Sequence, residues 1–271
     1  MGKNNGIHKM SNTLYDTVQK FCPDVLFAVF FDEGHDPLKD IISKISKTTP
    51  TKTIGWFCDS HYRYPSFDSK WAPFLDYCVT TSTLAMEWYK RDGFGNKVIK
   101  SQWGFSPKYK YMPWMEKDIP VSFVGQPHGD RRQVIDRLKI HGIPVQVYGT
   151  GWGKRLSFDE MIQMFNRSKI NLNLNNGCDV RCKQIKGRNF EVPGCGGFLL
   201  TESAENLSDY YTFNKEIGIY GSESDMIEKI RYYLEHNEER EQIAKAGMLR
   251  TMNDHTYEKR FDHIFRQANL I

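Results

Sequence analysis

The stretch 186–202 combines two cations, a carboxylate and a glycine cluster at the start of a predicted short helix. The first N–H groups of a helix are unpaired and its dipole is positive there, so this end attracts anions. Lys186 and Arg188 add full positive charges, and the pattern therefore predicts a phosphate site. Glu191 follows about one turn later, where it can accept hydrogen bonds from a hydroxyl pair. A diphosphate beside a ribose is what a sugar nucleotide presents.

A second candidate phosphate contact lies after the strand-like run 121–125. This run ends in Gly125, and Arg131 and Arg132 follow at the start of a predicted helix. A glycine loop lets the backbone approach a diphosphate, and the arginines supply charge. The alternative is an ordinary strand-to-helix turn with solvated arginines. Because the 186–202 stretch lies in the same half of the chain, we favour the diphosphate interpretation.

A third glycine-rich loop, residues 148–154, contains Tyr148, Gly149 and Trp152. A Walker A motif needs four residues between its first glycine and a Gly-Lys pair that Ser or Thr follows. Here the spacing is shorter and Arg155 follows the lysine, so we exclude a P-loop. We expect this loop to admit a ligand closely, with Trp152 against a nucleotide base.

The first half of the chain offers Asp59 and His61 directly after the predicted strand 52–58. Side chains at the carboxyl end of a parallel strand border the ligand crevice of an open sheet. A carboxylate or imidazole there can act as general base on an acceptor hydroxyl. Asp59 is our candidate for this role, with a helix cap or turn as its alternative.

Alternating strands and helices must position these residues. The first half has strand-like runs at 24–31, 52–58, 77–81 and 98–100, with helical patterns at 11–21 and 37–47. The second half has strand-like runs at 121–125, 144–149, 170–174, 198–201 and 217–220, with helical patterns at 130–141, 158–166, 224–236, 238–252 and 257–268. Near-continuous apolar strands between helices predict parallel sheets covered on both faces. We expect an α/β fold of two Rossmann-like domains facing a cleft, joined by a linker at 107–120. With about four strands, the first domain is predicted to be short.

Composition narrows the classes of partner. The formal net charge of +4 suits a phosphorylated substrate and is too small to favour nucleic acid. No run approaches the roughly 18 apolar residues of a membrane span, and the first residues lack the apolar core of a signal peptide. Cys178 and Cys182 have no accompanying histidine pattern, so no zinc site is expected, and the six cysteines are taken as reduced thiols. The expected location is the cytoplasm.

The chain resembles the CgeB-like glycosyltransferases, a branch of the GT-B nucleotide-sugar transferases. The resemblance covers most of the chain and rests on the order and spacing of six motifs: Trp56-Phe57-Cys58-Asp59, Phe123-Val124-Gly125 with Arg131-Arg132, Tyr148-Gly149-Thr150-Gly151-Trp152, Ile170-Asn171-Leu172-Asn173, Arg188-Asn189-Phe190-Glu191 with Gly194-Cys195-Gly196, and His255-Thr256-Tyr257-Glu258-Lys259-Arg260.

This resemblance implies that the second domain holds most of the sugar nucleotide and that Glu191 binds its ribose. It also implies that the last helix crosses back to the first domain, giving the ranges 1–110 (acceptor side), 120–254 (nucleotide sugar) and 255–271 (returning helix). In related retaining enzymes a second acid about eight residues earlier touches the donor sugar. Lys183 occupies that position here, so the chain departs from the acidic pair.

The sequence therefore predicts a metal-independent glycosyltransferase without a cofactor. Its donor is a nucleoside-diphosphate sugar, UDP or GDP, and its acceptor is the hydroxyl of a glycan, a lipid-linked glycan or another molecule. The candidate catalytic residues are Asp59, Lys186 and Arg188. The candidate donor-binding residues are Gly125, Arg131, Tyr148, Gly149, Trp152, Lys186, Arg188, Asn189 and Glu191. A catalytically silent sugar-nucleotide or glycan-binding protein, a sugar-nucleotide epimerase or hydrolase, and transfer onto modified DNA remain alternatives.

Overall fold

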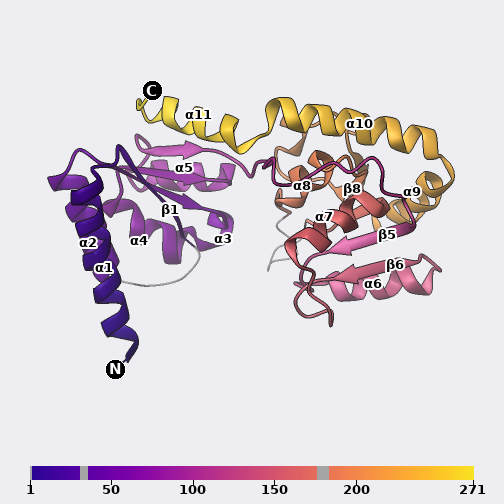
Figure 1. Cartoon of the computed structure of the whole chain (residues 1–271), viewed down its shortest axis with the longest axis horizontal. Helices are drawn as coiled ribbons and strands as arrows, with labels where there is room; N and C mark the ends of the chain where they lie inside the picture. Colours follow the sequence, from indigo (N-terminus) through magenta and orange to yellow (C-terminus); the bar gives the residue numbers. More distant parts are fainter. Residues whose placement is uncertain (1, 31–35, 176–182) are drawn as a thin grey trace. The chain divides into compact units, whose positions relative to one another are not determined.

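The computed structural model describes residues 2–30, 36–175 and 183–271, and the chain divides into two compact units (Figure 1). The first unit comprises the chain up to Gln102 together with Phe261–Ile271. The second unit is Trp103–Arg260. The predicted linker 107–120 thus lies within the second unit, where its end forms the start of a strand.

Parallel strands form the sheet of the first unit, in the order β1-β2-β3-β4 among the described residues. The strands are β1 (Val25–Phe30), β2 (Lys52–Phe57), β3 (Tyr77–Thr80) and β4 (Val98–Lys100). The surrounding helices are α1 (Gly2–Phe21), α2 (Asp36–Thr48), α3 (Ser60–Arg63), η1 (Tyr64–Asp68), α4 (Ser69–Trp71), η2 (Ala72–Phe74) and α5 (Thr83–Arg91). Apart from its first residue β2 is buried, which explains its mostly apolar sequence and confirms a sheet covered on both faces. The short helices between β2 and β3, and α5, were not predicted.

The second unit contains a larger parallel sheet, whose described strands have the order β6-β5-β7-β8-β9. These strands are β5 (Ile119–Val124), β6 (Val145–Tyr148), β7 (Ser168–Asn173), β8 (Leu199–Glu202) and β9 (Gly218–Tyr220). The helices are α6 (Arg131–Ile140), α7 (Phe158–Arg167), α8 (Arg188–Gly194), α9 (Glu223–Glu235) and α10 (Asn237–Asp254), with a 3₁₀ turn η3 (Leu207–Asp209). Helix α11 (Tyr257–Gln267) begins in this unit, and its residues from Phe261 onward belong to the first unit. The strands predicted from apolar runs in this half are confirmed.

The strand order of the second sheet has a switch point between β5 and β7. The chain moves outward from β5 to β6 and then returns to place β7 on the other side of β5. Helices α6 and α9 contribute Ile135, Leu138 and Ile230 to the core on one face, whereas α7 and α8 contribute Phe165 and Phe190 on the other. A crevice opens at such a switch point beyond the carboxyl ends of the strands, because the flanking helices leave toward opposite faces.

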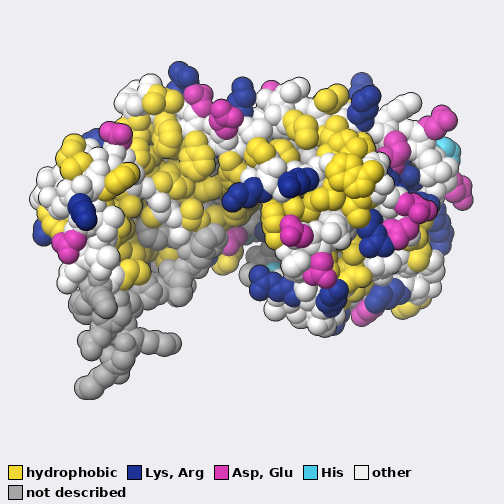
Figure 2. Space-filling model, in the orientation of Figure 1, with side chains coloured by type: hydrophobic (Ala, Val, Ile, Leu, Met, Phe, Trp, Pro, Cys, Tyr) yellow, Lys and Arg dark blue, Asp and Glu magenta, His cyan; other side chains and the backbone are white. Residues whose placement is uncertain are grey.

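The surface shows no dominant charge of one sign on the face in view. Figure 2 shows Lys and Arg side chains interspersed with Asp and Glu over the second unit. This distribution agrees with the small net charge of the chain. None of the described helices combines the length and the apolar character that a bilayer span requires.

Candidate functional site

A pocket of about 370 Å³ lies at the carboxyl ends of β5 and β6 in the second unit. We call it the loop pocket, because the loops after these two strands form much of its wall. It brings together Gly125, Gly149 and Arg188, which come from three separate sequence motifs. Its described lining residues are Val124, Gly125, Gln126, Gly149, Thr150, Arg155, Leu156, Ser157, Phe158, Met161 and Arg188. None of these is acidic, and two are arginines, so the pocket suits an anionic ligand.

The glycines of the two loops allow the backbones to touch. Gly149 has a φ of 139°, and a Cβ atom built on it would lie 2.1 Å from the carbonyl oxygen of Gly125. The N–H of Gly125 donates to the carbonyl of Tyr148 at 2.9 Å. A side chain at position 149 would therefore force the loops apart and change the wall of the pocket.

Arg188 supplies one of the two cations of the loop pocket. Its Nε donates to the carbonyl oxygen of Val124 at 3.1 Å, its Nη1 pairs with Glu191, and its guanidinium lies over the ring of Phe165. These contacts fix the side chain, of which 26% remains exposed. Helix α8 has only seven residues and no side-chain N-cap, so we ascribe the positive potential to the arginine charge more than to the helix dipole.

Glu191 lies one turn into α8 and is held on both carboxylate oxygens. The Tyr109 hydroxyl donates to its Oε1 at 2.8 Å, and Arg188 pairs with its Oε2. Burial, and then the charge of Glu191, raises the pKa of Tyr109, so this hydroxyl remains a donor. Each carboxylate oxygen has a second lone pair, which leaves capacity for ligand hydroxyls. Tyr109 was not among the predicted residues.

Asn189 and Lys186 set the start of α8. The side chain of Asn189 is fully buried, and its Oδ1 accepts from the backbone N–H of Lys186 at 2.8 Å and from Nδ2 of Asn173 at 3.3 Å. The Lys186 ammonium donates to Oε1 of Gln184 at 2.8 Å. Neither residue lines the loop pocket. Their roles in donor binding stay predictions, and the observed bonds of the Asn189 amide oxygen hold the backbone at the start of α8.

Arg131 is buried beneath the loop after β5 and is not exposed on the surface. Only 7% of the residue is exposed, and its two terminal nitrogens donate to the carbonyls of Gln126 at 3.0 Å and Leu174 at 2.6 Å. The guanidinium thus ties the loop after β5 to the end of β7. Diphosphate contact by Arg131 stays a prediction, whereas the observed bonds show that it holds the loop.

Trp152 and Tyr148 extend from the β6 end without lining the loop pocket. The Trp152 ring packs edge-on against Phe123, and the Arg132 guanidinium lies 4.8 Å from its centroid. The Tyr148 hydroxyl donates to Oε1 of Gln146 at 3.1 Å. Stacking of Trp152 on a base therefore remains a prediction.

Asp59 lies in the first unit, at the carboxyl end of β2 and at the N-cap position of α3. Its carboxylate makes no capping hydrogen bond to the helix, and its backbone carbonyl accepts from the N–H groups of Tyr62 and Arg63 instead. Asp59 thus occupies the helix-cap position that its alternative interpretation predicts, but its side chain makes no capping hydrogen bond. His61 is buried, with 8% exposed.

Sequence reasoning predicted the helix that begins at Phe158, but it did not name Arg155 or the first residues of this helix, α7, as site residues, although they line the loop pocket. Ser157 and Glu160 form a capping box there. The hydrogen bond from the backbone N–H of Ser157, and next that from the Lys154 ammonium, lower the pKa of Glu160 to about 2. The signal was present, because Ser-x-x-Glu before an apolar run predicts a helix start. Arg155 lies between the glycine-rich loop 148–154 and this helix start, which places its positive charge beside the loop.

The cysteines show no arrangement for metal binding in the part of the chain that the structure describes. Cys22, Cys58, Cys78 and Cys195 are free thiols. No three His, Cys, Asp or Glu side chains gather as metal ligands among the described residues. Cys178 and Cys182, for which no zinc site was expected, lie outside the described residues.

The two parallel-sheet units define a GT-B fold, that of a large class of glycosyltransferases. Residues 131–266, just over half of the chain, match a family model described as glycosyl transferase-like. The chain belongs to this family and is a glycosyltransferase. A search of curated proteins finds no match.

Solved structures of other proteins share this fold. Sucrose-phosphate synthase from Thermosynechococcus elongatus matches with a TM-score of 0.64 at 10% identity, over 98% of this chain and 77% of that one. Alr3699/HepE from Anabaena, in complex with UDP-glucose, matches with a TM-score of 0.70 at 10% identity, over 96% and 82%. A glycosyltransferase from Rickettsia africae matches with a TM-score of 0.59 at 10% identity, over 97% and 79%. At these identities the likeness establishes the fold alone.

Proposed function

We propose that the chain transfers a sugar from a UDP or GDP sugar to a hydroxyl of a glycan, a lipid-linked glycan or another acceptor, without a metal ion. The observation that carries the proposal is the loop pocket, in which Arg155 and Arg188 meet two glycine loops and no acidic side chain among the described lining. The likeness to Alr3699/HepE, whose structure holds UDP-glucose, supports a nucleotide-sugar donor.

The arginines have a direct role in this chemistry. When the bond between the sugar and the diphosphate breaks, negative charge develops on the departing phosphate. Arg188 is already fixed by Val124 and Phe165, so it stabilises that charge without first reorganising. Arg155, directly after the glycine-rich loop 148–154, adds a second positive charge. Lys186, two residues before Arg188, adds a third. Glu191 binds the ribose hydroxyls with the lone pairs that Tyr109 and Arg188 leave available.

Asp59 is our candidate for the general base on the acceptor hydroxyl. Replacing it by Asn keeps its shape and removes the basic oxygen, so Asp59→Asn should lower the transfer rate by roughly a thousandfold, since general bases contribute 10²–10⁴-fold. Donor affinity should not change. Product analysis with UDP and GDP sugars over a panel of acceptors measures both, and Asp40→Asn, an exposed carboxylate on α2, is the control. Transfer by Asp59→Asn at the wild-type rate would contradict the assignment.

We also propose that the chain belongs to the CgeB-like branch. The support is the order of the six sequence motifs, of which Gly125, Gly149 and Arg188 meet in one pocket. A structure-based alignment with a CgeB-like protein tests this branch. Placement of Arg188 or Glu191 opposite unrelated residues of that protein would refute it.

A further inference from the structure

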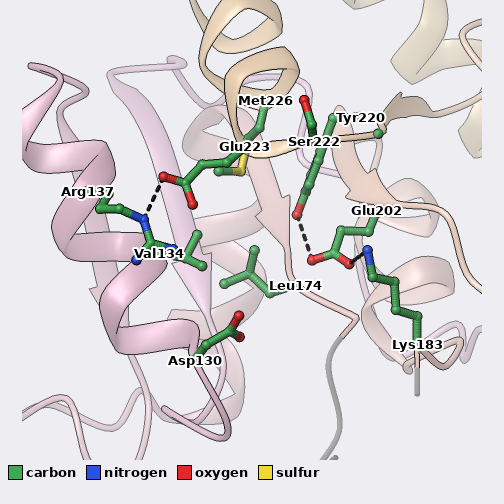
Figure 3. Close-up of a pocket in the computed structure, with 11 residues that line it drawn as sticks. Asp130, Val134, Arg137, Leu174, Lys183, Glu202, Tyr220, Ser222, Glu223 and Met226 are labelled. Atoms are coloured by element: carbon green, nitrogen blue, oxygen red, sulfur yellow. Dashed lines mark hydrogen bonds and ion pairs between the residues drawn. The ribbon is translucent and has the colours of Figure 1, made fainter. Parts of the chain in front are cut away.

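A second pocket, of about 340 Å³, lies at the carboxyl ends of β8 and β9 in the same unit (Figure 3). We call it the Glu202 pocket. Helices α6 and α9, on the face of the sheet opposite α7 and α8, supply two of its walls. Its described lining residues are Asp130, Val134, Arg137, Leu174, Lys183, Glu202, Tyr220, Gly221, Ser222, Glu223 and Met226.

Glu202 is the most buried carboxylate of this pocket, with 8% of the residue exposed. Its Oε2 lies 2.7 Å from the ammonium of Lys183, and its Oε1 accepts from the Tyr220 hydroxyl at 3.4 Å. Lys183, at the position where the family resemblance implies an acid, is thus paired with a carboxylate from β8. The Oε2 atom is enclosed, so Oε1, with its second lone pair, is the oxygen left to accept a hydrogen bond from a ligand.

The pocket also has an apolar side and a second carboxylate. Val134, Leu174 and Met226 contribute aliphatic surface. In Figure 3 the Asp130 carboxylate lies below Leu174 and the Glu202 carboxylate lies to its right. A ligand that lies over Leu174 would therefore meet carboxylate oxygens at two of its edges.

The Glu202 pocket differs from the loop pocket in the charge of its lining residues. The Glu202 pocket has three carboxylates, Asp130, Glu202 and Glu223, against the two cations Arg137 and Lys183, and Arg137 is paired with Glu223 at 2.6 Å. A phosphate would gain little there, because like charges repel it. An uncharged ring with outward hydroxyls and an apolar C–H face fits both the acceptors and the aliphatic surface.

We propose that the Glu202 pocket binds an uncharged saccharide ring, with its hydroxyls donating to Glu202 and Asp130. Arg131 shows that the two pockets are neighbours, because it donates to Gln126, which lines the loop pocket, and to Leu174, which lines the Glu202 pocket. The ring can thus be the sugar of the donor or a separate saccharide. The inference rests on the proposed glycosyl transfer for its ligand class, but not on the residues proposed to hold the diphosphate.

Calorimetric titration tests the proposal. The ligands are UDP, GDP, UDP-glucose, UDP-galactose, UDP-N-acetylglucosamine, GDP-mannose and the corresponding free monosaccharides. We expect Glu202→Gln to weaken the saccharide ligand that binds best by about tenfold, as for loss of a hydrogen bond to a charged group, and to leave UDP within about twofold. Loss confined to the nucleotide sugars identifies the donor sugar, and loss confined to a free monosaccharide identifies a separate saccharide.

Two further variants keep the test decisive. Asp130→Asn changes a half-exposed side chain and should weaken the same ligand if Glu202→Gln does not fold. Asp118→Asn removes a surface ion pair with Arg167, just before β5, and should change nothing. Unchanged affinity across the panel in Glu202→Gln and Asp130→Asn, or weaker UDP binding in Glu202→Gln, overturns the proposal. Normal UDP binding by Arg188→Ala would instead contradict the diphosphate site alone.

Discussion

The two pockets of the second unit share one sheet edge but differ in charge. The loop pocket has two arginines and no acidic residue in its described lining, whereas the Glu202 pocket has three carboxylates and two cations. Each uses different helices, because the switch point between β5 and β7 sends α6 and α8 to opposite faces of the sheet. The fold therefore supplies two hollows, and the side chains decide which part of a ligand each can hold.

The difference also appears in how each pocket holds its charged groups. In the loop pocket Arg188 is held by Val124 and paired with Glu191, but that carboxylate is not among the described lining residues, so the wall itself carries the cation. In the other pocket Lys183 lies 2.7 Å from Glu202 and both residues line the wall, so cation and carboxylate meet the ligand together. One buried residue, Arg131, lies between the two and fixes their spacing.

Between the two pockets, the largest expected effect comes from replacing one arginine in each. Arg188→Ala should lower kcat/KM for transfer by about a hundredfold, because one positioned charge on a developing anion contributes on the order of 3 kcal/mol. Arg137→Ala removes a cation of the Glu202 pocket and should leave UDP affinity within about twofold. Steady-state kinetics and UDP titration measure the two. Equal loss of UDP affinity in both variants would remove the distinction between the pockets.

A smaller effect is expected from the contact between the glycine loops. Gly149→Ala places a Cβ against the Gly125 carbonyl and should weaken UDP binding by about tenfold, as local strain of 1–3 kcal/mol spreads the loops. Gly153→Ala is the matched control, because Gly153 has a φ of 99° but no neighbour within 4 Å of its Cβ position. If the two variants bind UDP equally well, the close approach of the loops has no part in the site.

Much of this arrangement could be predicted from the sequence. Apolar runs identified the strands of both sheets, and parallel strands bring their carboxyl ends to one edge, so Gly125 and Gly149 had to lie near one another. Arg188 joined them because its helix begins at the same edge. The burial of Arg131 and the pairing of Lys183 with Glu202 could not be predicted. Both depend on tertiary neighbours that no local pattern specifies.

The most direct test of the account is a crystal structure of the chain with UDP. We predict the diphosphate in the loop pocket, within hydrogen-bond distance of Arg188 and Arg155, and the ribose hydroxyls on Glu191. A diphosphate bound in the Glu202 pocket, or bound without contact to Arg188, would contradict the central claim that the second unit separates the anion from the sugar by charge.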